Sequence, residues 1–163
     1  MSEYFISIKG LKQGQFKGDQ PNRVGRTDWI AGIDFAMGLE VPRDEHTGLP
    51  TGKRQWKPIQ ITMQWGAASP QILQALAANE TLNPVIFEFT RMAPDGKEQI
   101  HQTITLTNAT IVSVGRSINS DGSRQTHTRD PYELEIIELT FQKITMQDAA
   151  GGTMFTDDWE STS

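Results

Sequence analysis

Ile59-Gln60-Ile61-Thr62-Met63-Gln64-Trp65 is the stretch of sequence that decides the fold. Its apolar side chains occupy every second position, so a β-strand over these residues has one apolar face and one polar face. Ser69-Pro70 then opens a different pattern, in which apolar residues recur at helical spacing. Proline is well tolerated at the first helical position, because its missing N–H has no partner there. The sequence therefore predicts a strand followed by a short helix at about 70–79.

The same alternation recurs upstream, in residues 32–40. Four apolar residues, Ile33, Phe35, Met37 and Leu39, alternate there with four polar or small ones, Asp34, Ala36, Gly38 and Glu40. A strand over this segment would place the second set together on one polar face.

Further strands are predicted at about 85–92, 98–107, 109–118 and 132–145, with a turn at 92–97 between the first two. Asn108 could mark a bend, but the apolar phase leaves open whether 98–118 is one strand or two. A change of phase in the last segment indicates a β-bulge near Ile136-Ile137. In the helix, Ile72, Leu73 and Leu76 are the side chains expected to be buried. One short helix among many strands predicts an all-β fold, either a closed barrel or a sandwich.

Length and composition favour one globular domain over residues 1–163. The chain has 36% hydrophobic and 21% charged residues and carries a net charge of -5, which argues against a nucleic-acid partner. No apolar run is long enough to span a membrane, so we expect no membrane insertion. The opening MSEYFISIKG lacks the features of a secretory leader. We therefore expect folding and assembly in the cytoplasm, and any export without a cleaved signal peptide.

No catalytic, cofactor or metal site emerges from the sequence, and we expect no enzyme. Cysteine is absent, which excludes disulfides and thiol catalysis. The segment 48–54 resembles a phosphate loop only faintly, because its spacing, its hydroxyl residue and its following helix are all missing. The histidines His46, His101 and His127 lack the spacing of zinc ligands. The pair Asp157-Asp158 is expected to be solvated charge in a C-terminal tail at about 148–163.

The extended loop 42–58, PRDEHTGLPTGKRQWKP, is unusually long for a connection in a small domain. Its three prolines lack the N–H that a central strand needs, so a regular barrel strand is excluded. The loop nevertheless carries apolar Leu49 and Trp56 beside basic Lys53-Arg54. We expect Trp56, and Trp159 in the tail, to dock either back onto this domain or onto another protein surface.

Several segments, taken in order, cover nearly the whole chain: Phe5 to Leu11, the loop from Thr47 to Arg54, Lys57-Pro58-Ile59 ahead of the helix, Ile104 to Ala109, Glu138 to Ile144, and Asp157-Asp158-Trp159. Together they resemble the hemolysin-coregulated protein (Hcp) family, the tube protein of bacterial type VI secretion systems. The chain departs from the family at Met146, where many members carry tryptophan, and at Trp56, where many carry histidine.

The resemblance implies a small β-barrel of two packed sheets with one helix, and a structural role. Family members close into homohexameric rings that stack into a tube inside a contractile sheath, with a spike at the tip. The tube is expelled from the cell, and some members hold effector proteins in its channel. By this resemblance, the loop residues Leu49, Lys53, Arg54 and Trp56 would contact the adjacent ring, and Asp34, Ala36, Gly38 and Glu40 would line the channel. The alternative is a free β-sandwich binding module for sugar or peptide.

Overall fold

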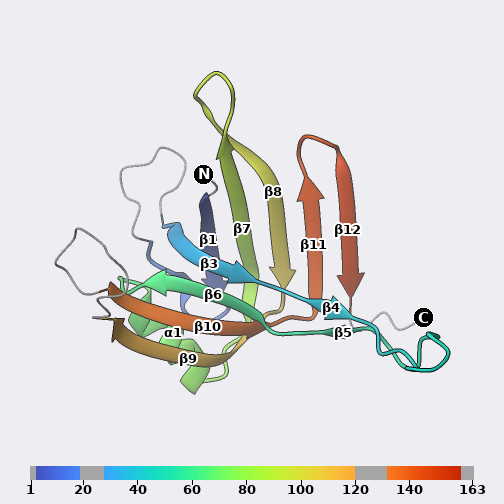
Figure 1. The fold of residues 1–163 in the computed structure, drawn as a ribbon. Helices are drawn as coiled ribbons and strands as arrows, with labels where there is room; N and C mark the ends of the chain where they lie inside the picture. Colours follow the sequence, from blue (N-terminus) through green and yellow to red (C-terminus); the bar gives the residue numbers. More distant parts are fainter. Residues whose placement is uncertain (1–2, 19–27, 120–131, 159–163) are drawn as a thin grey trace.

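A computed structural model of the chain describes residues 3–18, 28–119 and 132–158. These residues form twelve strands and one helix (Figure 1). In chain order the elements are β1 (Glu3–Gly10), β2 (Gly14–Gln15), β3 (Ile30–Ala36), β4 (Leu39–Glu40), β5 (Gln55–Trp56), β6 (Ile59–Gln64), α1 (Ser69–Ala77), β7 (Leu82–Met92), β8 (Glu98–Thr107), β9 (Thr110–Asn119), β10 (Tyr132–Thr140), β11 (Lys143–Asp148) and β12 (Thr153–Asp158). The expected all-β class with one short helix is confirmed.

Ten of the strands belong to one antiparallel sheet, in the order β12-β11-β8-β7-β1-β3-β6-β10-β9, with β2 added at the end of β1. Figure 1 shows β7, β8, β11 and β12 standing side by side, while β3, β6, β10 and β9 run across their ends. Within the described residues no ladder joins β12 to β9, so the sheet is not a closed barrel. The helix α1 packs against β9 and covers that end of the core instead of a closing strand.

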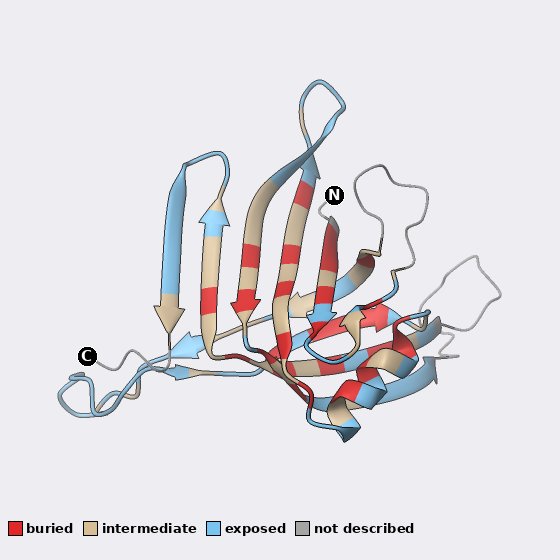
Figure 2. Cartoon of the chain, turned by 180° about the vertical axis from the view of Figure 1, so that it is seen from behind, coloured by how far each residue is buried: buried red, intermediate tan, exposed pale blue. Residues whose placement is uncertain are grey.

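The core lies between the two halves of the sheet and the helix. Figure 2 shows buried residues interleaved with more exposed ones along β7 and the second half of β8, as alternating strands require, whereas β1 buries Tyr4, Phe5 and Ile6 in succession. The side chains of Ile59, Ile61 and Met63 in β6 are fully buried. They pack with Ile6 from β1 and Ile72 from α1 in one cluster. The alternation that predicts the strand thus also identifies its core face.

The helix begins at Ser69, with Pro70 in its first turn, and ends at Ala77. Ser69 does not cap it, because its Oγ accepts a hydrogen bond from the Gly66 N–H at 3.0 Å instead. Ile72 is buried and Leu76 packs against the core, but Leu73 is 39% exposed. The expectation that Leu73 is buried is therefore wrong. The third buried position of the helix belongs to Ala75, because the helix packs through a narrower stripe than its apolar residues suggest.

The bulge expected near Ile136-Ile137 is also wrong, because β10 pairs regularly with β6 through both residues. Glu135 points inward, in phase with Ile137 and Leu139, and it is fully buried. Its Oε1 accepts a hydrogen bond from Arg116 Nε at 2.8 Å, and the guanidinium lies 4.0 Å from the ring centroid of Trp65. A buried carboxylate paired with arginine thus keeps the inward phase continuous from Glu135 to Leu139.

The long segment expected at 132–145 divides into β10 and β11, with Phe141-Gln142 between them. A register shift instead occurs in the ladder of β10 with β9, where Val112 has no opposite residue. The question of one or two strands at 98–118 is settled by Asn108, whose positive φ of 50° separates β8 from β9.

A second internal carboxylate, Glu80, fixes the turn between β1 and β2. Glu80 follows the helix and is 3% exposed. Its Oε2 accepts hydrogen bonds from the backbone N–H groups of Lys12 and Gln13, at 3.0 and 2.9 Å. Its Oε1 accepts a third from the Gln13 amide at 3.1 Å. Burial alone would raise the pKa of Glu80, but these hydrogen bonds hold it below its ordinary value.

Candidate functional site

Residues 39–56 form an extension that we call the arm. Strand β4 pairs with β5 through Leu39 opposite Trp56 and Glu40 opposite Gln55, and a further bridge joins Arg43 to Pro50. Figure 1 shows the arm leaving the rest of the sheet beside the end of β12. The segment predicted as an extended loop is therefore a long hairpin, whose prolines lie outside its short strands.

The tip of the arm is held by its own hydrogen bonds. The Asp44 carboxylate accepts a hydrogen bond from the His46 N–H at 2.7 Å, and the Gly48 N–H donates to the Asp44 carbonyl at 2.9 Å. Gly48 has a φ of 72°, which favours glycine. Leu49 lies next to it and is 64% exposed. The arm thus presents an apolar side chain on an ordered turn, away from the core.

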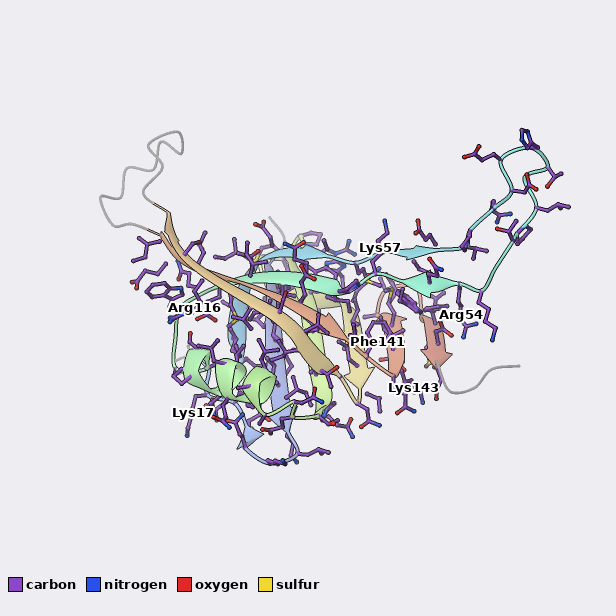
Figure 3. All side chains as sticks on the ribbon, turned by 90° about the horizontal axis from the view of Figure 1, so that it is seen from below. Lys17, Arg54, Lys57, Arg116, Phe141 and Lys143 are labelled. Carbon is purple, nitrogen blue, oxygen red and sulfur yellow. The ribbon has the colours of Figure 1, made fainter. Side chains whose placement is uncertain are left out.

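Arg54 and Trp56, at the base of the arm, both bind the carboxylate of Asp157 in β12. Arg54 Nε donates to Asp157 Oδ2 at 2.7 Å, and Arg54 Nη2 lies 2.6 Å from Oδ1. The indole Nε1 of Trp56 donates to the same Oδ2 at 2.7 Å. Figure 3 shows Arg54 where the arm meets this strand. We call these three residues the latch.

Trp56 also packs against the body of the protein. Its ring lies edge-on to Phe141, with centroids 5.3 Å apart, and its centroid is 6.3 Å from that of Phe155. Of the two docking modes left open for Trp56, the structure shows the contact with its own domain. Trp159 lies outside the described residues.

The electrostatics of the latch favour its charged form. The hydrogen bonds from Arg54 lower the pKa of Asp157, with the Trp56 indole acting in the same direction. The side chain of Asp157 is only 11% exposed, against 41% for Arg54. The expectation that Asp157 is solvated tail charge is therefore wrong, because Thr153–Asp158 forms a paired strand that carries this carboxylate to the arm.

The strand predicted over residues 32–40 is divided into β3, which ends at Ala36, and β4, which begins at Leu39 and belongs to a separate two-stranded sheet. On the predicted polar face, Asp34, Ala36 and Glu40 are exposed, while Gly38 is half-buried. Phe35 and Met37 point the other way and pack against the core. Ile33 does not join them and is 45% exposed, because the ladder with β6 shifts register between Gly32 and Asp34.

Two further contacts define the ends of this face. The Tyr4 hydroxyl donates to the main-chain carbonyl of Asp34, which leaves the Asp34 carboxylate out of that bond. At the other end, Lys57 Nζ lies 4.0 Å from Glu40 Oε2, and a Cβ on Gly38 would come 3.3 Å from the Lys57 side chain. The structure therefore places Asp34 and Ala36 on an open surface and Gly38 and Glu40 beside the base of the arm.

Across residues 3–18, 28–119 and 132–158, no three histidine or acidic side chains come together as a metal site requires. The same residues include no helix that is long and apolar enough to cross a membrane. The contacts that distinguish the surface around the base of the arm are those of the latch. Sequence reasoning had singled out Arg54 and Trp56 but not their partner, whose only signal was its place in the Asp157-Asp158-Trp159 ending.

Comparisons with known proteins agree over nearly the whole chain. Residues 5–147 match the family described as "Type VI secretion system effector, Hcp". A curated relative, the "Major exported protein" of Pseudomonas aeruginosa, is 31% identical over 169 residues, covering 96% of this chain and 95% of the relative.

Solved structures agree with the sequence relatives. A structure described as "Crystal structure of Hcp protein" superimposes with a TM-score of 0.88 at 25% identity, covering 99% of this chain and 100% of that one. "Secreted protein Hcp3 from Pseudomonas aeruginosa" gives a TM-score of 0.78 at 26% identity, with 99% and 100% coverage. The chain therefore belongs to the Hcp family of type VI secretion system proteins.

Proposed function

We propose that this chain is a structural subunit of the type VI secretion tube. In this proposal six copies close into a ring, and rings stack into a tube that is exported when the surrounding sheath contracts. The observation that carries the proposal is the agreement of three matches: the family over residues 5–147, the curated relative over 96% of this chain, and the fold over 99% of it.

The arm is the proposed contact between stacked rings. Its tip presents Leu49, and Lys53, in the segment just before β5, adds positive charge beside Arg54, whose charge is paired with Asp157. An apolar side chain on an ordered, self-bonded turn loses little conformational freedom on docking, which supports a role in binding. In this proposal Trp56 anchors the base of the arm and thereby supports the contact that the tip makes.

The open face of β3 is the proposed lining of the channel. Asp34 has a small polar side chain and Ala36 a short one. Both project from the face of the sheet that lies opposite the core side chains. Gly38 and Glu40 extend this surface towards the arm. Such a wet, weakly acidic surface suits transient contact with effector proteins, which we propose as passengers.

Partners, place of assembly and chemistry follow from the same proposal. The sheath and the spike protein would contact the outside and the end of the tube, with assembly in the cytoplasm followed by export. The subunit would act by assembly, without a catalytic step or a cofactor.

Export measured in the bacterium that makes this chain tests the proposal. A tagged copy should reach the medium only when the contractile sheath protein is present. The matched control is a strain that differs only in the loss of the sheath. Equal export from both strains would overturn the proposed role, because a tube subunit needs contraction to leave the cell.

A further inference from the structure

Among the described residues, no strand ladder joins the arm to the edge strand β12 of the main sheet. The two strands of the arm pair only with each other, and the ten-stranded sheet ends on this side at β12. At the base, the Lys57 N–H donates to the Gly38 carbonyl, which joins the two entering chains to one another. The arm thus continues the backbone pairing of β3 with β6, and the contacts that tie it sideways to β12, and so fix its direction relative to that strand, are made by side chains.

Those polar contacts converge on one carboxylate. Both carboxylate oxygens of Asp157 contact the Arg54 guanidinium, and one of them also accepts the hydrogen bond from the Trp56 indole. Arg54 Nη2 also donates to the Asp158 carbonyl at 3.4 Å. A guanidinium that meets a carboxylate at two points fixes the relative orientation of the groups as well as their distance. Trp56 lies two residues after Arg54 in the arm, so the latch constrains the base of the hairpin at two residues.

Asp157 lies outside the surface that the tip of the arm presents to a neighbour. It lies in β12, the edge strand of the main sheet, which pairs with β11 and through it with β8. The exposed tip at Leu49 belongs to the opposite end of the arm (Figure 1). A change at Asp157 therefore alters how the arm is held without altering the side chains at its tip.

We propose that Asp157 is a positioning residue for ring stacking, which acts through Arg54 and Trp56 to hold the arm in one direction. This inference rests on the proposed function. A tip held in one direction has already lost the freedom that a loosely hinged tip would lose on docking. Because a ring presents several arms to the next ring, a loss of order in each arm weakens every contact of the stack together.

The test measures the direction of the arm directly. The chain has no cysteine, so cysteines introduced at Glu45 in the arm and Gln74 in α1 can carry two unique spin labels. Both positions are exposed. Labelled chains are diluted into unlabelled ones, and the distance distribution is measured by pulsed electron resonance. We expect one narrow distribution with Asp157 and a broad one in Asp157→Asn, which keeps an acceptor for the Trp56 indole but loses the charge that binds Arg54.

Assembly is measured on the same variants without labels. We expect Asp157→Asn and Arg54→Ala to form rings of normal size and to lose stacked tubes in electron micrographs. Asp157→Glu keeps the carboxylate and should recover part of the stacking, which a loss of packing alone would not do. The matched control Asp95→Asn makes the same change at an exposed aspartate in the turn between β7 and β8, outside the arm and the latch, and should leave tubes unchanged.

The outcomes separate this inference from the function on which it rests. Narrow distances and normal tubes in Asp157→Asn would overturn the positioning role while leaving the tube function intact. If the unaltered chain forms no rings, the proposed function fails. The distance distributions then still decide whether Asp157 holds the arm, and an unchanged distribution contradicts the latch.

Discussion

Trp56 donates an indole hydrogen bond to the carboxylate of Asp157 at 2.7 Å, across 101 positions of the sequence. This contact joins the long hairpin, which we propose as the ring contact, to strand β12 of the same chain. Trp56 therefore contributes to the folded subunit before any neighbour arrives. A substitution at Trp56 alters the subunit as well as any interface that it forms.

The first prediction separates the two parts played by Trp56. Trp56→Ala should destabilise the subunit by about 1–3 kcal/mol, less than the roughly 3–5 kcal/mol of a fully buried aromatic residue, because the ring is only half-buried. Trp56→Phe keeps the packing against Phe141 and loses only the hydrogen bond, so its loss should be smaller. Urea unfolding of the three proteins measures the difference. Equal stability of Trp56→Ala and the unaltered chain would contradict the packing described for this ring.

The second prediction concerns the tip of the arm. Leu49→Asp should leave folding and ring size unchanged, because the side chain is 64% exposed in the subunit. It should remove stacking, because burial of one leucine contributes about 1.5–3 kcal/mol and every arm of the ring loses it. The matched control is Leu11→Asp, at a leucine 65% exposed outside the arm. Normal tubes from Leu49→Asp would show that the tip is not the stacking contact.

The third prediction concerns the open face of β3. Asp34→Arg should leave the ring intact, because the Tyr4 hydroxyl bonds to the main-chain carbonyl of Asp34 and not to its carboxylate. Reversal of charge on the proposed channel wall should change the amount of effector protein that co-purifies with the ring. Glu45→Arg introduces the same charge change on the arm and serves as the control. If Asp34→Arg and Glu45→Arg retain equal amounts of effector, this face does not line the channel.

The fourth prediction uses the buried carboxylate of Glu80. Glu80→Ala leaves the N–H groups of Lys12 and Gln13 without their partner and should cost about 1–3 kcal/mol at pH 7. Because the pKa of Glu80 is lowered in the folded chain, its contribution is complete above the ordinary glutamate pKa of about 4.3 and is lost as the pH falls through the folded value. The stability difference between the two proteins should therefore shrink between pH 7 and pH 3.

Urea unfolding at several pH values measures this difference. The exposed Glu45→Ala is the control and should show little difference from the unaltered chain at any pH. A stability difference for Glu80→Ala that stays constant from pH 7 to pH 3 would contradict the bonding of the charged carboxylate.

Local patterns predicted much of this fold because they reflect local physics. The alternation at Ile59 to Trp65 identifies β6 and its buried face, and Pro70 marks the first turn of the helix. Asn108, which the pattern left ambiguous, ends β8 through a positive φ that asparagine tolerates better than most residues. In each of these cases the signal lies within a few residues of the feature.

Errors arose where a distant residue decides the outcome. Glu135 can be buried because Arg116 neutralises it from the neighbouring strand, so no bulge is needed to keep the inward phase. Ile33 is exposed because the ladder with β6 shifts beside it. Asp157 looked like tail charge because its partners, Arg54 and Trp56, lie more than 100 residues earlier. The sequence could therefore identify the arm, but not the strand that holds it.

The mass of the purified protein in solution tests the central claim most directly. Size-exclusion chromatography with light scattering should give six chains of 18.2 kDa each, about 109 kDa, over a range of protein concentrations. Electron micrographs of the same fraction should show closed rings. A single species of 18.2 kDa at every concentration would contradict the ring, and with it the assignment of the arm and the open face to assembly.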